Sequence, residues 1–256
     1  MKRYFLLGTM TMLAVIVSAV FCTAGYIVKE STTSEAVTPM GPQTNTDVST
    51  IYIEKGKIKS FSETDSTTMI VRLDKQIMYD IDHSDKTYQE IPFAVLESMS
   101  KNIGDASSPE MQEAMKGMSP EQKAMMEKMM GEMFAPMNVE RTSETKSLIG
   151  HKCQKYVISR SGKSIMEIWA AEDLEVGRDF TEYLKITSAG HSEMFAEFDK
   201  IKGMPLETTV SMEMGGVKTK SHNVVTEVNQ SSIGDSEFEV PAGYKKVAFE
   251  PPQEER

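Results

Sequence analysis

The sequence is poor in the residue types that build most catalytic and metal centres. Its 256 residues include two cysteines, four histidines and one tryptophan. Two cysteines cannot form a framework of several disulfides or a four-cysteine zinc site. The H-E-x-x-H pattern of zinc proteases and the G-x-S-x-G pattern of serine hydrolases are both absent. We therefore predict a protein that is not an enzyme and that needs no cofactor.

The sequence also lacks a surplus of basic residues. It carries 28 Lys and Arg residues against 38 Asp and Glu residues, which gives a net charge of −10. A protein that binds nucleic acid needs a basic face, so we predict no nucleic-acid partner. The hydrophobic fraction of 39% argues against a wholly disordered chain.

Only one long apolar run without charge occurs, and it lies at the N-terminus. Two basic residues precede residues 4–21, and the small residues Cys22 and Ala24 stand shortly before Gly25. This order is typical of a secretory signal, so we predict that residues 1–24 are a cleaved signal peptide. A retained anchor is an alternative, but the run is short for a membrane span of about 20 apolar residues. Acylation of Cys22 is another alternative, although the bulky Phe21 precedes it.

Export would place the protein in the periplasm or the cell envelope. Removal of the signal would leave 26 basic and 38 acidic residues, a net charge of −12. It would also leave Cys153 as the lone cysteine, which cannot close an internal disulfide in an oxidising compartment. We interpret Cys153 as a small, buried apolar residue.

Short runs of alternating polar and apolar residues, divided by turn residues, fill most of the remaining chain. This spacing indicates an antiparallel meander. The predicted strands are Tyr26–Thr32, Val48–Lys55, Lys57–Glu63, Thr67–Asp74, Gln76–Asp80, Thr87–Ile91, Val139–Lys146, Lys152–Arg160, Lys163–Ala171, Leu206–Met214, Val217–Val228 and, closing the sheet, Phe238–Val240. Apolar residues alternate with Arg72 in one strand and with Ser211 in another. We therefore expect one covered face and one solvated face.

Two helical insertions interrupt the predicted strands. The first is the methionine-rich segment 93–137, with helices within Phe93–Phe134, and the second spans Asp179–Lys200. Ser108 and Ser119 each precede a proline and a glutamate, as expected of a helix N-cap. Gln122 stands three residues after Ser119 and predicts a capping box at the start of the last helix.

Methionines are concentrated in the first insertion, where ten of the 21 fall between Met99 and Met137. Five of them recur along one face of the last predicted helix. Packing of this face on the sheet is one interpretation. Binding of an apolar ligand is a second, because methionine is flexible and polarisable. The residues predicted to line such a site are Met125, Met126, Met129, Met130, Met133, Phe134 and Trp169.

A soft-metal site is a third interpretation of the same segment. Thioethers select Cu(I) or Ag(I), and M-x-x-M spacing can supply two ligands from one helix face. The candidate ligands are Met115, Met118, Met126, Met129, Met130 and Met133. No histidine lies in the segment to complete the site. The leading hypothesis, binding of an apolar ligand, therefore includes no metal.

Several short blocks, in this order, resemble a family of exported bacterial proteins known only as a domain of unknown function. The blocks are Ile77–Asp82 with Lys86–Tyr88 and Ile91-Pro92, then Leu148–Tyr156, Glu167–Trp169, Gly203–Leu206 and Phe238–Tyr244. The resemblance covers residues 26–247. That family is similar to the LolA/LolB-like lipoprotein carriers. The resemblance implies a curved antiparallel half-barrel covered by helices, with the methionine-rich segment in the cover. It provides no ligand-contact motif that can be carried over.

The sequence thus predicts an α+β protein with a LolA-like half-barrel. Residues 25–247 form one domain, and residues 248–256 form a charged tail. The predicted function is binding of a hydrophobic small molecule or lipid, or of an acylated protein, in the periplasm or envelope. Soft-metal binding is an alternative, as is a structural envelope protein that acts through protein partners. The oligomeric state is left open.

Overall fold

A computed structural model describes residues 25–38, 41–104, 117–133, 135–174, 196–214 and 217–249 of the chain. The predicted signal peptide, residues 1–24, lies outside the described residues. The same holds for residues 250–256 of the predicted tail and for residues 175–195, which include most of the second predicted helical insertion.

One sheet of twelve strands makes up most of the described chain. The strands are β1 (Gly25–Thr38), β2 (Gly41–Glu54), β3 (Lys57–Ser62), β4 (Thr67–Arg72), β5 (Ile77–Asp82), β6 (Thr87–Pro92), β7 (Met137–Leu148), β8 (His151–Arg160), β9 (Lys163–Ala171), β10 (Met204–Met214), β11 (Val217–Ser231) and β12 (Lys245–Lys246). Their order across the sheet is β12-β6-β5-β4-β3-β2-β1-β11-β10-β9-β8-β7. All pairs are antiparallel except β12 with β6. The predicted antiparallel sheet is therefore confirmed.

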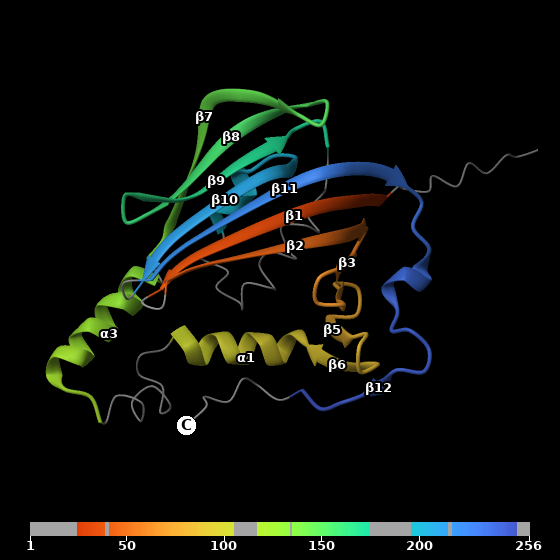
Figure 1. The fold of residues 1–256 in the computed structure, drawn as a ribbon, viewed down its shortest axis with the longest axis horizontal. Helices are drawn as coiled ribbons and strands as arrows, with labels where there is room; N and C mark the ends of the chain where they lie inside the picture. Colours follow the sequence, from red (N-terminus) through yellow and green to blue (C-terminus); the bar gives the residue numbers. More distant parts are fainter. Residues whose placement is uncertain are drawn as a thin grey trace, which may run out of the picture.

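The sheet is strongly curved. Figure 1 shows β7 to β11 with β1 and β2 as an arched roof, from which β3 to β6 turn down as a wall at one end. Helix α1 (Phe93–Gly104) crosses the open side below the roof. We call the side of the sheet that faces α1 the concave side and the opposite side the convex side.

Helical cover is less extensive than the sequence predicted. Helix α1 lies across the open side, whereas α3 (Pro120–Met133) projects at the end of the molecule away from β3 to β6. The predicted cap of α3 is confirmed: the amide of Gln122 donates to Ser119 Oγ at 3.2 Å, and Gln122 Oε1 accepts from the Ser119 amide at 2.8 Å. The predicted cap at Ser108 lies outside the described residues.

The concave side of β7 to β9 is covered by the short 3-10 helix η1 (Ala196–Lys200), the described end of the second predicted insertion. Phe198 of η1 packs against Tyr156, Ile158 and Ile168. None of the helices in the described ranges combines the length and apolar character that a membrane span requires.

The prediction of a closing strand at Phe238–Val240 is wrong. The chain forms the 3-10 helix η2 (Asp235–Phe238) there, and the short parallel strand β12 follows at Lys245 and Lys246. The reason is packing: Phe238 is fully buried against Ile70 and Ile81 on the convex side of β4 and β5. We call residues 232–249 the C-terminal strap, because this segment lies along the convex side of β3 to β6.

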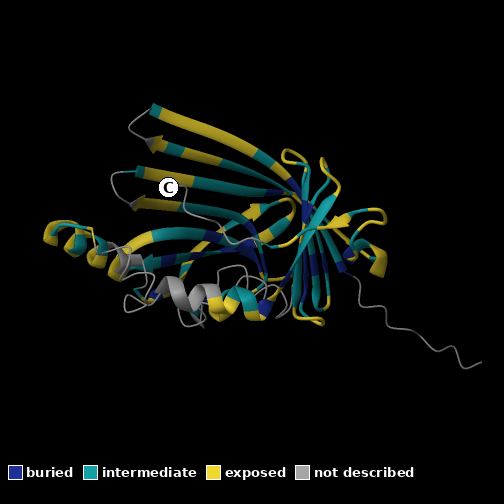
Figure 2. Ribbon diagram, turned by 90° about the horizontal axis from the view of Figure 1, so that it is seen from below, coloured by how far each residue is buried: buried dark blue, intermediate teal, exposed yellow. Residues whose placement is uncertain are grey.

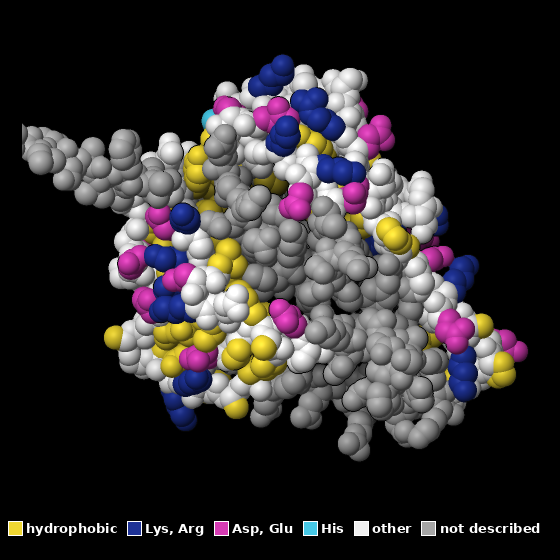
Figure 3. Space-filling view, turned by 180° about the vertical axis from the view of Figure 1, so that it is seen from behind, with side chains coloured by type: hydrophobic (Ala, Val, Ile, Leu, Met, Phe, Trp, Pro, Cys, Tyr) yellow, Lys and Arg dark blue, Asp and Glu magenta, His cyan; other side chains and the backbone are white. Residues whose placement is uncertain are grey.

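The strap also overturns the expectation of a solvated face at Arg72. This side chain is 6% exposed, and its guanidinium donates to Asp74 at 2.7 and 2.8 Å and to Glu239 of the strap at 2.7 Å. Lys57 and Lys59 pair with Asp235 and Glu237. Figure 3 shows this mixture of basic and acidic side chains at the wall end of the molecule. The convex face of the wall is therefore covered by the strap.

The opposite end of the roof shows the reverse departure from the prediction. The tips of β1, β2, β10 and β11 carry exposed and half-exposed residues on both faces (Figure 2). Met212 was expected on a covered face of β10, but it is 49% exposed. Val37 at the tip of β1 is 54% exposed. In this part of the sheet neither face is buried.

Candidate functional site

Helix α3 carries the predicted methionine face away from the main sheet. Met125 is 59% exposed and Met126 is half-buried. Met129, Met130 and Met133 belong to the same helix, but their side chains lie outside the described set, as do Phe134 and Met115. Met118 is half-buried just before the helix. Exposure of Met125 means that α3 does not bury this thioether in the core, as the packing interpretation required.

Figures 1 and 2 show α3 at the same end of the molecule as the tips of β10 and β11. Met125 on α3 and Met212 on β10 are the two most exposed methionines among the described residues. Figure 3 shows apolar side chains among charged ones at this end. We call α3 and the tips of β1, β2, β10 and β11 the methionine end.

Trp169 does not join the methionines. Trp169 packs against the buried cluster that includes Cys153, Ala171 and Leu206. The ammonium groups of Lys146 and Lys155 lie 4.3 and 5.6 Å from its ring centroid. Trp169 stands near the end of β9 away from α3 (Figure 1). Its half-buried position fits core packing, with both lysines stabilising the ring through cation–π contacts.

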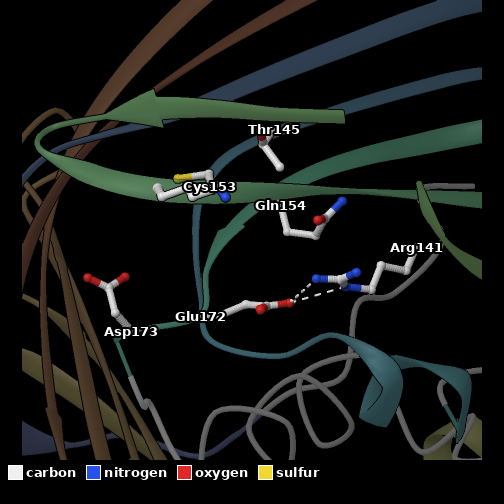
Figure 4. Close-up of a pocket in the computed structure, with 7 residues that line it drawn as sticks. Arg141, Thr145, Cys153, Gln154, Glu172 and Asp173 are labelled. Atoms are coloured by element: carbon white, nitrogen blue, oxygen red, sulfur yellow. Dashed lines mark hydrogen bonds and ion pairs between the residues drawn. The ribbon is translucent and has the colours of Figure 1, made fainter. Parts of the chain in front are cut away.

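A second site, which the sequence did not predict, is a polar pocket of about 340 Å³ near the sheet edge. Figure 4 shows side chains from β7, β8 and the turn after β9 around it. Its lining residues are Arg141, Thr145, Lys152, Cys153, Gln154, Glu172 and Asp173.

A bulge in β7 shapes one wall of this pocket. Regular pairing stops after Arg141 and resumes at Thr145, which faces Gln154 of β8. The Nε2 atom of Gln154 lies 2.7 and 3.0 Å from the carbonyl oxygens of Thr142 and Glu144, which the bulge removes from the ladder. Gln154 is 6% exposed, so a buried side chain replaces the lost strand pairing.

Ion pairs organise the opposite wall. Arg141 Nε and Nη2 donate to Glu172 Oε1 at 3.2 and 3.1 Å, and Tyr156 Oη donates to the same oxygen at 3.0 Å. Burial opposes ionisation, but these hydrogen bonds hold the pKa of Glu172 below its usual value. His151 Nδ1 lies 2.8 Å from Asp173 Oδ2 and lowers the pKa of that carboxyl.

Cys153 lines the pocket without the environment of a nucleophile. It is fully buried, as the sequence analysis predicted, and burial raises the pKa of its thiol. A raised pKa disfavours the thiolate that nucleophilic catalysis requires. Both carboxylates are held ionised by their partners, so this pocket suits recognition through hydrogen bonds better than proton transfer.

Sequence reasoning missed Arg141, Gln154, Glu172 and Asp173. No motif joins them, because they lie on three different segments that only the sheet brings together. Among the described residues, no group of three or more histidine, cysteine, aspartate or glutamate side chains could hold a metal ion.

The chain matches the profile of the family described as a domain of unknown function (DUF4412) over residues 110–244, more than half of its length. It belongs to this family. No protein with a curated description matches the sequence.

Similar solved structures include an uncharacterised conserved protein from Thermus thermophilus, with 7% identity, a TM-score of 0.44 and coverage of 86% of this chain and 90% of that one. A LolA superfamily protein from Nitrosomonas europaea has 6% identity, a TM-score of 0.33 and coverage of 83% and 90%. The MucB chain, solved in complex with MucA, has 8% identity and a TM-score of 0.38. The similarity covers 88% of this chain but 57% of that one. The predicted membership of a family of unknown function is thus confirmed by the family match, and no ligand or partner is carried over from these structures.

Proposed function

We propose that this protein binds an apolar ligand, such as a lipid or an acylated protein, between the concave side of its sheet and a movable cover that includes α3. The exposed thioether of Met125 on the methionine-rich helix α3 carries the proposal. An apolar helix face that does not serve the core of a folded protein marks an interaction surface, and methionine adapts to ligands of different shape. Met125, Met126, Met129, Met130, Met133 and Phe134 are the proposed contacts.

An apolar floor inside the bend of the sheet supports this proposal. Val28 on β1 packs with Ile53, Ile58 and Leu206 in one buried cluster. Because β1 belongs to the roof and β3, which carries Ile58, belongs to the wall, this cluster lies inside the bend. Binding a ligand there requires the cover to move, which suits a helix that projects from the sheet.

Displacement of a fluorescent fatty acid tests the proposal directly. The double change Met125→Gln with Met126→Gln keeps side-chain length and helix propensity but removes two thioethers. We expect it to weaken fatty-acid binding at least about fivefold. The matched control is Glu127→Gln with Lys128→Gln, which changes two polar positions of the same helix and leaves the net charge unchanged.

Native mass spectrometry of the protein purified from its own source would identify the ligand. A spectrum without any bound molecule, together with no fatty-acid binding by the purified protein, would overturn the proposal. Equal loss of binding in the test and control variants would remove the methionines from the site while leaving the concave floor as the candidate.

Soft-metal binding is the second candidate, and helix geometry favours it. Helix α3 is continuous through the spacings Met126/Met129 and Met130/Met133, so each pair shares a helix face. Anaerobic titration with Cu(I) against bicinchoninate tests this function. Failure of the protein to compete for the metal would exclude a tight site.

We also propose that the chain is exported and acts in the periplasm or envelope, with an envelope protein as its class of partner. The signal-like residues 1–24 support export. Cell fractionation combined with the N-terminal sequence of the purified protein tests it. A cytoplasmic chain that retains residues 1–24 would contradict the proposal.

A further inference from the structure

The polar pocket beside the β7 bulge contains a side-chain amide whose orientation is fixed. Gln154 Nε2 lies within 3.2 Å of three carbonyl oxygens, those of Thr142, Glu144 and Lys155. If the amide were rotated by half a turn, the acceptor Oε1 would face three other acceptor oxygens. The positions of Nε2 and Oε1 are therefore determined. The carbonyl end of Gln154 therefore faces away from the bulge, on the side of the pocket that it lines.

This carbonyl end is an open acceptor. Every hydrogen bond that Gln154 makes through its side chain uses Nε2, so Oε1 has no donor among the described residues. An acceptor at a pocket wall that has no protein donor is free to accept from a bound molecule. A ligand hydroxyl group in the pocket would supply that donor. Figure 4 shows Gln154 above Glu172 and Arg141, with the space of the pocket between these segments.

Cationic and anionic side chains line this pocket in equal number. Arg141 and Lys152 are cationic, and Glu172 and Asp173 are anionic. Arg141 uses Nε and Nη2 to bind Glu172 Oε1, which leaves Nη1 to donate and Glu172 Oε2 to accept. A balanced set of charges attracts neither a cation nor an anion strongly. It suits a neutral molecule whose groups both donate and accept.

We propose that this pocket binds a neutral polyhydroxylated ligand, a mono- or disaccharide, through Gln154, Glu172, Asp173 and Arg141. Each sugar hydroxyl group donates one hydrogen bond and accepts others, which matches the mixed lining. The volume of about 340 Å³ lies at the small end of ligand pockets. This site is separate from the proposed apolar site and does not depend on it.

Saturation-transfer NMR and calorimetry with three probes of the same ring test the proposal: glucose, cationic glucosamine and anionic glucuronate. We expect the purified protein to bind glucose, and to bind each charged sugar at least about threefold more weakly. Addition of glucose should also shift the side-chain amide resonance of Gln154, a measurement that needs no variant.

The variants Glu172→Gln and Asp173→Asn each remove one negative charge without changing side-chain size. We expect each to weaken glucose binding about tenfold at an unchanged Tm. The matched control is Glu167→Gln, because Glu167 lies on β9 outside the pocket and pairs with Lys155. Glu167→Gln should bind glucose as the parent protein does.

Three results would overturn the proposal: no binding of any of the three sugars, tighter binding of a charged sugar than of glucose, or equal loss in Glu167→Gln and Glu172→Gln. If a pocket variant fails to fold, an unshifted Gln154 amide in the parent protein at saturating glucose would decide against it.

Discussion

The two ends of the sheet are built from strands with a similar alternation of polar and apolar residues. They differ in whether another segment of the chain packs on the faces of those strands. At the wall end, β4 carries Ile70, Val71 and Arg72, all buried, and the C-terminal strap lies across its convex side. At the methionine end, Val37 and Met212 are about half-exposed and both faces of the strands meet solvent (Figure 2). An alternating strand pattern thus defines two faces, but a distant segment decides whether a face is buried.

The strap fits the wall because acidic residues and a buried apolar residue alternate along it. Asp235, Glu237 and Glu239 pair with Lys57, Lys59 and Arg72, while Phe238 enters the apolar cluster. Tyr244 Oη lies 2.7 Å from His83 Nδ1, whose Nε2 atom lies 2.7 Å from Thr68 Oγ1. The strap thus combines apolar burial with charge complementarity.

Removal of the Phe238 side chain should have the largest effect on the stability difference between the two ends. Phe238→Ala leaves a cavity under the strap and should lower the free energy of unfolding by about 3–5 kcal/mol. The matched change at the methionine end, Val37→Ala, should cost less than about 0.5 kcal/mol. Urea unfolding of both variants measures the difference. Equal costs would mean that the strap is not part of the cooperative core.

Replacement of Arg72 should have the next largest effect. Arg72→Met keeps the buried stem but removes the donors to Asp74, Glu239 and the carbonyl oxygen of Phe238. We expect a loss of about 2 kcal/mol in the free energy of unfolding, because a buried acceptor loses its partner. Urea unfolding measures this loss, and Lys218→Met, at an exposed ion pair of the other end, is the control. A loss in Arg72→Met no larger than that in the control would contradict the role of Arg72.

Acid should weaken the same contact. The hydrogen bonds from Arg72 lower the pKa of Asp74 and Glu239 in the folded protein. Their stabilisation is therefore complete above the unfolded pKa of about 4 and is lost as pH falls through the lowered folded value. The difference in urea midpoint between the parent protein and Arg72→Met should be smaller at pH 3 than at pH 6. A difference that grows on acidification would contradict the assignment.

Oxidation of methionines should distinguish exposed from buried thioethers with almost no effect on stability. Dilute hydrogen peroxide converts accessible thioethers to sulfoxides. Met125 and Met212 should react at least about tenfold faster than Met204, which is 3% exposed, and the buried Met137. Peptide mass mapping over time gives the rates. Similar rates for Met204 and Met125 would show that α3 buries its methionine face in solution.

Local features of the chain were predictable from the sequence. The Ser119 cap of α3 depends on side chains three residues apart, so its geometry follows from adjacent residues. The hairpins of the meander depend on turn residues between alternating runs. The burial of Cys153 was predicted because a lone cysteine behaves as a small apolar residue.

Features that join distant segments were not predictable. The strap places Glu239 on Arg72, 167 residues away along the chain, and turns a predicted solvated face into a buried one. The polar pocket needs the β7 bulge, and nothing in residues 141–145 indicates that Gln154 will complete it.

The sequence by itself therefore determined the strand pattern and the cap of the methionine helix. Only the tertiary structure decided that α3 projects, that the strap covers the wall, and that Gln154, Glu172 and Arg141 line one pocket. The physical reason is the separation along the chain over which each effect acts. Backbone preference and periodicity act between neighbouring residues, whereas burial and ion pairing depend on which distant surface the fold brings into contact.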